Sequence, residues 1–328
     1  MTGNTGDTGN TGDTGDTGNT GNSGGAGIKG EFGGGWFIED RSDFPFVSAS
    51  DPFGAPLDSQ RLTLPIAAKS FTERAWTARW WAFLVLHDFV AALPNWHGVA
   101  DARMNIEWGT IVDPPIGELN TLMNDHRNER AAAMGEILSQ DVEFNTDFMA
   151  LLSITPGTHP NTYRVMHIAS QIASYAALYY KGLRQRPRPS QLLPALLPPV
   201  PIPGHSSWPS GHATQAWLKA LCLEFVLTGT TRAPGTAMTG LPPNPITGPS
   251  ATPIAPGTMN LGAISANLRT LAMRVARNRE IAGLHYPTDS QAGRVLADAI
   301  FPTLTAMMTP APSTWFRKAV DAARLEWT

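Results

Sequence analysis

Apolar residues recur along most of the chain at the spacing of helices that bury one face. Between residues 71 and 93, for example, Trp76, Trp80, Phe83, Leu84 and Phe89 recur at helical intervals. No run alternates between apolar and polar residues as a half-buried strand would. The pattern therefore predicts an all-α chain with helices over residues 71–93, 116–140, 142–152, 161–183, 210–227, 259–282, 288–308 and 313–326.

Two long segments interrupt this pattern. Residues 187–209 contain eight prolines, so we expect an extended and stiff loop there. Residues 229–258 are rich in Gly, Pro and Thr, and they predict a surface excursion between two helices. Neither segment has to divide the helical part into separate domains, and we expect one domain over residues 36–328.

The first 35 residues have a different composition. Residues 2–22 repeat the triplet Thr-Gly-Asn or Thr-Gly-Asp seven times, and a glycine-rich stretch follows. Glycine at every third position is typical of collagen, but the repeat lacks proline and is too short for a triple helix. We predict a disordered tail over residues 1–35. Calcium binding by Asp7, Asp13 and Asp16 is the weaker alternative, because their spacing matches no known calcium loop.

Composition narrows the classes of function. Of the 328 residues, 42% are apolar and only 16% are charged, and the net charge is −3. This balance argues against a nucleic-acid-binding protein, which needs a broad basic face. The only cysteine, Cys222, lies in an apolar run and predicts a small buried side chain rather than a disulfide.

The sequence shows no segment of the length and apolarity of a membrane span. The longest apolar run begins at Trp80 and is interrupted by His87 and Asp88. The N-terminus lacks the charged and then apolar pattern of a secretory signal. We therefore expect a protein that has no membrane partner and is cytoplasmic or exported by a non-classical route. Association into a homo-oligomer stays open.

Cations gather in the stretch KGLRQRPRPS, at residues 181–190. A solvated helix end explains such a cluster when it stands alone, because cations favour helix C-termini. We keep that interpretation for Arg184 and Arg186. For Lys181 and Arg188 we favour anion binding, because groups that suit an anion follow further along the chain.

The stretch WPSGHATQAWL, from residue 208, provides the first of these groups. Ser210, Gly211 and His212 open a predicted helix, where unpaired N–H groups and a partial positive charge attract anions. Glycine lets an anion approach the backbone closely, and histidine can carry or accept a proton. Ser210 also has the residue type of a helix cap, and both roles can hold together.

The stretch RNREIAGLHYPTDS, from residue 277, provides the rest. Arg279 ends one predicted helix, His285 follows in a turn, and Asp289 lies at the start of the next helix. Asp289 can accept a hydrogen bond from one ring nitrogen of His285, which leaves the other nitrogen oriented and basic. Lys181, Arg188 and Arg279 together would hold a phosphate-like anion and the extra charge of its transition state.

In order and spacing, these three motifs resemble the superfamily of type-2 phosphatidic acid phosphatases and vanadium-dependent haloperoxidases. They span residues 181–289, about a third of the chain. The resemblance implies an all-helical bundle with its site between helices. It also implies that the oxygens of the anion are bound by Lys181, Arg188, Ser210, Gly211 and Arg279.

The same resemblance implies the catalytic roles. His285 would be the phosphorylated nucleophile of a phosphatase or the vanadium ligand of a haloperoxidase. His212 would be the acid–base group, and Asp289 would orient His285. The chain departs from the family at Asn278, where serine usually precedes the last arginine.

The stretch HSSWPSGHATQ looks closest to the haloperoxidases, in which vanadate is the cofactor. His205 stands where bromoperoxidase-like members carry histidine, and it is a candidate halide-site residue together with Trp208. Taken singly, His205 reads as a loop residue and Trp208 as a packing residue. We expect a haloperoxidase that oxidises bromide or iodide with hydrogen peroxide. The alternatives are an acid phosphatase that acts on phosphate esters through a phosphohistidine at His285, and a phosphate-binding scaffold without catalysis.

Overall fold

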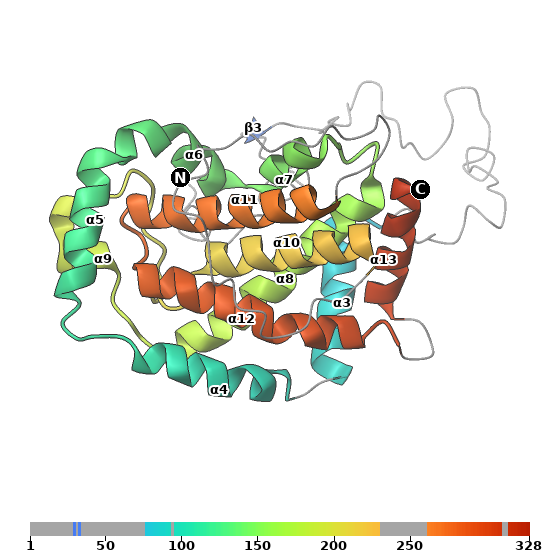
Figure 1. Ribbon diagram of the computed structural model, residues 1–328, viewed down its shortest axis with the longest axis horizontal. Helices are drawn as coiled ribbons and strands as arrows, with labels where there is room; N and C mark the ends of the chain where they lie inside the picture. Colours follow the sequence, from blue (N-terminus) through green and yellow to red (C-terminus); the bar gives the residue numbers. More distant parts are fainter. Residues whose placement is uncertain (1–28, 31, 34–75, 93–94, 230–260, 310–313) are drawn as a thin grey trace, which may run out of the picture. The chain divides into compact units, whose positions relative to one another are not determined.

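The computed structural model describes residues 29–30, 32–33, 76–92, 95–229, 261–309 and 314–328. The described residues form helices and one pair of very short strands (Figure 1). The longer helices are α3 (Ala78–Ala92), α4 (Trp96–Gly109), α5 (Ile116–Asn128), α6 (Arg130–Val142), α7 (Asn145–Leu152), α8 (Pro160–Leu183), α10 (Gly211–Thr228), α11 (Leu261–Ile281), α12 (Pro287–Ala306) and α13 (Trp315–Arg324). Three short pieces complete the set: α9 (Pro189–Leu192), η4 (Pro194–Leu196) and η5 (Leu325–Trp327). The prediction of an all-α chain is confirmed.

The described residues fall into two compact units: residues 78–328, with their gaps, belong to the first, and residues 29–30, 32–33 and 76–77 belong to the second. All the helices among the described residues belong to the first unit. In the second unit, β2 (Lys29–Gly30) pairs antiparallel with β3 (Phe32–Gly33). This pair lies within residues 1–35, for which the sequence predicts a disordered tail, and that stays a prediction because most of these residues lie outside the described part of the chain. The Asp residues of the triplet repeat and the expected domain start at residue 36 lie outside the described residues.

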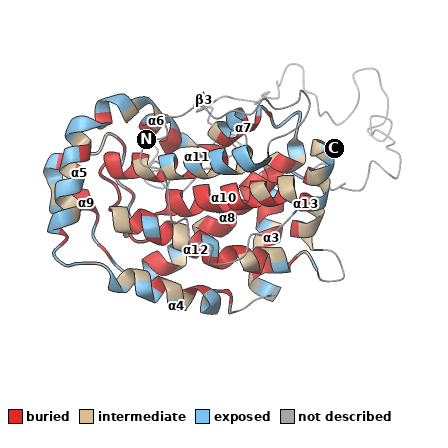
Figure 2. Ribbon diagram, viewed as in Figure 1, coloured by how far each residue is buried: buried red, intermediate tan, exposed pale blue. Residues whose placement is uncertain are grey.

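Helices α8 and α10 form the centre of the helical unit. Helix α10 contacts α8, α11 and α12, and α8 contacts α3 and α13 as well (Figure 1). Nearly every residue of α10 is buried, as the sequence GHATQAWLKALCLEFVLT suggests with its apolar residues on all sides (Figure 2). Lys219 is buried too, and its ammonium lies 3.6 Å from the centre of the Phe144 ring.

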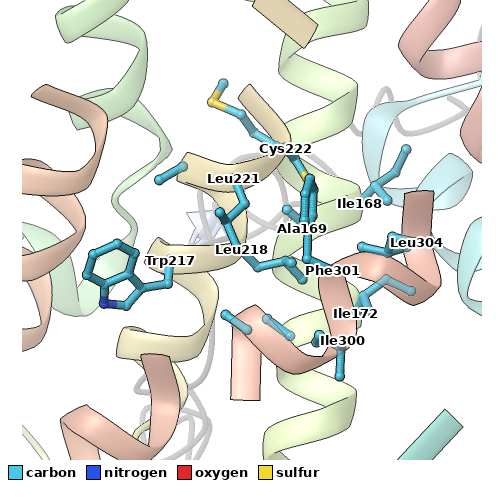
Figure 3. Close-up of a cluster of buried hydrophobic side chains, with 14 of the residues drawn as sticks. Ile168, Ala169, Ile172, Trp217, Leu218, Leu221, Cys222, Ile300, Phe301 and Leu304 are labelled. Atoms are coloured by element: carbon cyan, nitrogen blue, oxygen red, sulfur yellow. The ribbon is translucent and has the colours of Figure 1, made fainter. Parts of the chain in front are cut away.

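The main core fills the space between these helices. Figure 3 shows side chains of α8, α10 and α12 that meet in it, among them Ile168, Leu218, Cys222 and Phe301. Cys222 is fully buried and unpaired, which confirms its predicted role as a small apolar residue. This core fixes how the starts of α10 and α12 lie relative to the end of α8, and those three places carry the sequence motifs.

Gly293 marks the closest approach of α12 to the start of α10. A Cβ atom at this position would lie 2.7 Å from the Ser210 carbonyl oxygen and 3.1 Å from the Thr214 amide nitrogen. Both neighbours are backbone atoms of α10, so they cannot turn aside as a side chain would. We expect Gly293→Ala to force the two helices apart and to lower the free energy of unfolding by about 1–3 kcal/mol. Urea unfolding measures this change, and an unchanged midpoint would contradict the packing.

Some helix boundaries differ from those predicted. The helix expected over residues 116–140 is two helices that break at Glu129, and the residues around the break are neither Gly nor Pro. Helix α4 was not predicted, although Trp96, Ala100 and Met104 are buried at helical spacing along it. The proline-rich loop is also less extended than expected, because it contains α9 and η4.

Within the residues that the structure describes, no helix has the length and apolar character needed to cross a membrane.

Candidate anion site

The three motifs meet in space. The guanidinium of Arg188, in the loop after α8, donates a hydrogen bond to the Leu284 carbonyl at 3.0 Å, and its Nη1 lies 3.5 Å from Nε2 of His285. The amide of Ser210, at the start of α10, donates to the carbonyl of Asp289 at 3.0 Å. Segments about a hundred residues apart in sequence therefore surround one place, as the sequence predicted.

His285 is held in the orientation that the sequence suggested. Its Nδ1 lies 3.3 Å from Oδ2 of Asp289, and the same carboxylate accepts the Tyr286 amide at 3.0 Å. A carboxylate accepts, so Nδ1 carries the proton and Nε2 presents its lone pair on the side of Arg188. Burial lowers the pKa of His285 well below the usual range, and the charges of Arg188 and Lys181 lower it further. The ring is therefore neutral, as a nucleophile or a metal ligand must be.

Arg186 corrects the sequence interpretation. It was expected on a solvated helix end, but it is buried and forms ion pairs with Asp289 at 2.7 Å and Glu118 at 2.6 Å. Its guanidinium also covers the Tyr286 ring at 3.8 Å. Arg186 thus neutralises and fixes the carboxylate that orients His285. Arg184 is half-buried and donates to Asn105 at 2.8 Å, so it lies nearer the surface, as expected.

Lys181 and Arg188 are buried cations without a carboxylate. They are 4% and 1% exposed. Lys181 donates to the carbonyls of Ser206 and Ser207, while Arg188 donates to carbonyls and contacts His205 and His285. Among the described residues, neither forms an ion pair with an acidic side chain.

Burying a charge without a paired counter-charge is costly, and the pKa values of these two groups express that cost, which the nearby charge of Asp289 offsets only in part. Burial lowers the pKa of Lys181 well below its usual range, and the nearby charge of Arg188 adds to the shift. Burial also lowers the pKa of Arg188 to about 10. An anion bound between the two side chains would offset part of this penalty.

Arg279 is the third cation, and it is completely buried. Its guanidinium pairs with Asp141 at 3.2 Å and donates to the carbonyl of Ile137, both on α6, while its buried Nε has no partner. Burial lowers the pKa of Arg279 to about 10, and it raises that of Asp141. The free Nε–H is an unsatisfied donor of the kind that an oxyanion accepts.

Helix α6 also positions His212, and no pattern in the sequence indicated this contact. Nε2 of His212 lies 3.0 Å from the carbonyl of Gln140, and its ring stacks on Phe144 with centroids 5.4 Å apart. Since a carbonyl only accepts, Nε2 carries the proton and Nδ1 is the nitrogen that can take one. Burial lowers the pKa of His212 well below the usual range, with a smaller effect from Arg279.

The start of α10 has room for a ligand. Ser210 caps the helix, since its hydroxyl accepts from the Ala213 amide at 3.3 Å. Gly211 is buried, yet a Cβ atom placed on it would meet no heavy atom within 4 Å. A buried glycine beside open space is what close approach of an anion to the helix start requires.

We expect Gly211→Ala to separate folding from binding. The added methyl group has space in the fold, so the free energy of unfolding should change by less than about 1 kcal/mol, in contrast to Gly293→Ala. The same methyl group would occupy the space proposed for the anion, so orthovanadate and phosphate should bind at least about tenfold more weakly. Isothermal titration calorimetry measures this, and unchanged affinity would show that the space is not the anion site.

The two candidate halide residues lie in different surroundings. Nδ1 of His205 lies 3.1 Å from Nη2 of Arg188, which can only donate, and 3.3 Å from the carbonyl oxygen of Ser206, which can only accept. The two contacts ask for opposite tautomers, and the shorter one, to Arg188, favours the proton on Nε2. That Nε2 is buried without a partner, and burial lowers the pKa of His205 to about 4. Trp208 instead packs against Trp108 and Tyr180 in the core. His205 thus lies beside the cations, and Trp208 has the packing surroundings that its residue type suggests.

Asn278, the departure from the family pattern, is hydrogen-bonded to α6. Its amide nitrogen donates to Glu136 and Gln140 of α6, at 2.9 Å each. It therefore stabilises the helix that positions Arg279 and His212, rather than standing beside the proposed anion as an added donor.

A pocket of about 630 Å³ reaches this cluster from the surface. Lys181, His205 and Ser206 are among the residues that line it, with Gly204 and Leu178. Small solutes can therefore approach the two site residues between the end of α8 and the loop before α10.

The donors suit an oxyanion. Cationic side chains, an unpaired Arg279 Nε–H and a helix start all offer hydrogen bonds to oxygen, and one neutral imidazole stands beside them. Vanadate, the cofactor that the family resemblance implies, is such an oxyanion and would need that single histidine at the metal. Over residues 76–92, 95–229, 261–309 and 314–328, no group of three or more His, Cys, Asp or Glu side chains is placed to hold a metal ion.

A scan against models of protein families finds none that matches this chain, and a search of curated proteins finds no significant match.

Proposed function

We propose that this chain is a vanadate-dependent haloperoxidase that oxidises bromide or iodide with hydrogen peroxide. One observation carries the oxyanion part of the proposal: Lys181 and Arg188 are buried without a carboxylate, next to the lone pair of His285. The choice of a haloperoxidase rests on the resemblance of HSSWPSGHATQ and on the free donor of His205.

In this proposal each residue acts through a contact that the site provides. Lys181, Arg188 and Arg279 would hold the oxygens of vanadate, together with the first turn of α10, and His285 would be the ligand of the metal through Nε2. When bound, vanadate supplies a Lewis acid that activates peroxide for attack by halide. His212 takes up or gives back the proton that this activation requires, at Nδ1, and Asp289 keeps His285 in the correct tautomer.

His205 supports the halide part of the proposal. Its Nε2–H is buried, has no partner and lies on a ring held by Arg188 at 3.1 Å. Such a donor would stabilise a halide ion or an oxygen of peroxide beside the anion, and the 630 Å³ pocket brings solutes to the same ring.

A phosphatase is the second candidate, and the tautomer of His285 supports it equally. Because Nδ1 of His285 donates to Asp289 at 3.3 Å, its Nε2 is free to attack the phosphorus of a phosphate ester and form a phosphohistidine. His212 would give a proton to the leaving oxygen and then accept one from the water that releases phosphate. The same cations would stabilise the five-coordinate transition state.

One pair of assays decides between the two. The purified chain is incubated with bromide or iodide and hydrogen peroxide, with and without added orthovanadate, and separately with an aryl phosphate. We expect halide oxidation that depends on vanadate. Phosphate release without vanadate-dependent halide oxidation would instead establish the phosphatase, and neither activity would leave a phosphate-binding protein.

A further inference from the structure

A carboxylate from a distant helix reaches the segment that carries His285. Glu118 lies on α5, and its Oε1 accepts hydrogen bonds from the amide of Thr288 at 3.0 Å and from the Thr288 hydroxyl at 2.8 Å. Thr288 lies in the first turn of α12, directly before Asp289. Glu118 therefore caps the helix start that carries Asp289, where unpaired amides favour a negative charge.

Glu118 also ends a row of alternating charges that leads to His285. Its Oε2 accepts from Nη2 of Arg186 at 2.6 Å, and Nη1 of Arg186 donates to Oδ1 of Asp289 at 2.7 Å. The other oxygen of Asp289 lies 3.3 Å from Nδ1 of His285. Arg186 and Asp289 are buried, and the Glu118 side chain is only 19% exposed. The arginine thus has a carboxylate on each side, and its charge is shared between them.

The contact between Asp289 and His285 is the longest of the row. The two arginine contacts are short, as charge-assisted bonds are, whereas 3.3 Å lies just beyond the usual range of about 2.7–3.2 Å for N–H···O bonds. An arginine without Glu118 would be free to turn and take both oxygens of Asp289, because such pairs are often bidentate. Glu118 and Thr288 hold the guanidinium so that only Nη1 reaches Asp289, which leaves Oδ2 for His285.

We propose that Glu118 is a positioning residue of the anion site, which acts through Arg186 to leave the charge of Asp289 on the side of His285. A carboxylate that accepts from the far nitrogen of a histidine raises the basicity of the other nitrogen, so Glu118 strengthens Nε2 as a ligand or nucleophile. Loss of such outer partners usually costs about 10–100-fold in metal affinity or activity. The part that concerns vanadate rests on the proposed function, while the hydrogen bond of His285 can be tested without it.

The test variant is Glu118→Gln, which removes the charge and keeps the size of the side chain. Glu326→Gln is the matched control, because Glu326 caps the start of α8 in the same way. It accepts from the amide of Asn161 at 2.7 Å, and from the amide and the hydroxyl of Thr162 at 2.8 Å each. That helix start is the end of α8 remote from Lys181. Both variants remove one carboxylate from a helix start, so an effect on stability alone would appear in both.

The first measurement is NMR of the whole chain with nitrogen-15-labelled histidine, without vanadate or phosphate. The His285 signals are assigned by their absence from His285→Ala. In the natural chain we expect one ring nitrogen, Nδ1, with the shift of a protonated nitrogen and the other, Nε2, with that of a lone pair. The separation of the two shifts should narrow in Glu118→Gln and stay unchanged in Glu326→Gln.

The second measurement is the affinity for orthovanadate and for phosphate by isothermal titration calorimetry. Both anions meet the cations of the site, but in the proposed function only vanadate uses Nε2 of His285 as a ligand. We expect the affinity for vanadate relative to that for phosphate to fall at least about tenfold in Glu118→Gln and to stay unchanged in Glu326→Gln. Removing a negative charge would by itself tighten the binding of both anions, so the ratio isolates the effect on His285.

Unchanged ring shifts in a folded Glu118→Gln chain would overturn the proposal, and so would an unchanged affinity ratio or equal changes in both variants. If Glu118→Gln does not fold, Thr288→Val replaces it, because it removes only the hydroxyl that accepts from Arg186 and donates to Glu118. A natural chain that does not bind vanadate would contradict the proposed function. The ring shifts, measured without any anion, would then decide on Glu118 alone.

Discussion

Replacing His285 by alanine is expected to abolish turnover, with a loss of at least about 10³-fold in kcat for halide oxidation and equally for phosphate release. The reason is that Nε2 of His285 presents its lone pair beside the buried Arg188. Asp289, whose Oδ2 lies 3.3 Å from Nδ1, fixes the tautomer of the ring. Alanine removes the lone pair and leaves the cations without their nucleophile or ligand. Steady-state rates with bromide and peroxide, and with an aryl phosphate, measure the loss.

The control for this variant is His87→Ala, since His87 is 79% exposed and lies on α3. It should keep full activity and an unchanged unfolding midpoint. Circular dichroism checks that His285→Ala retains its helices, because His285 is buried and its removal leaves a cavity. Full turnover in a folded His285→Ala chain would show that His285 is neither the nucleophile nor the metal ligand, and it would contradict the site assignment of both enzymatic proposals.

The sequence predicted the members of the site because their signals are local. Pro160 at the start of α8, and Ser210 as the cap of α10, mark helix ends that can be recognised from a few neighbouring residues. His285 and Asp289 are four residues apart across a helix start, so their contact also follows from short-range geometry.

The parts that the sequence did not reveal depend on contacts between distant segments. Arg186 is the same residue type as its half-buried neighbour Arg184. It is buried because it pairs with Glu118 and Asp289, which lie 68 and 103 positions away in the sequence. Helix α6 binds Arg279 and His212 through the carbonyls of Ile137 and Gln140, and carbonyls are present at every position of every chain. No side-chain pattern could mark them.

The helix boundaries show the same distinction. The break at Glu129 separates α5 from α6 without a glycine or proline, so the apolar spacing continues through it and predicts one helix. Arg130 at the start of α6 donates to the carbonyls of Ile281 and Leu196, and these tertiary contacts fix the place of the turn. Local propensity does not encode them.

Orthovanadate and phosphate should stabilise the folded chain, and Lys181→Met should remove most of that effect. A ligand that binds only the folded state at a hundred times its Kd adds about 2.7 kcal/mol to the free energy of unfolding. Losing a buried cation that contacts the anion weakens binding by about a hundredfold. At the same anion concentration the added stability then falls to about 0.4 kcal/mol.

Without the anion, Lys181→Met should change stability little, because the methionine removes a buried charge together with its two hydrogen bonds to the Ser206 and Ser207 carbonyls. Lys318→Met is the matched control. It lies on α13, at the opposite end of α8 from Lys181. Glu326, just after α13, accepts hydrogen bonds from the first residues of α8, whereas Lys181 lies near the other end of that 24-residue helix. Thermal unfolding with and without orthovanadate measures both variants. Because Lys181 is a buried cation of the proposed site and has no ion pair there, full anion-dependent stabilisation in Lys181→Met would show that the anion binds elsewhere.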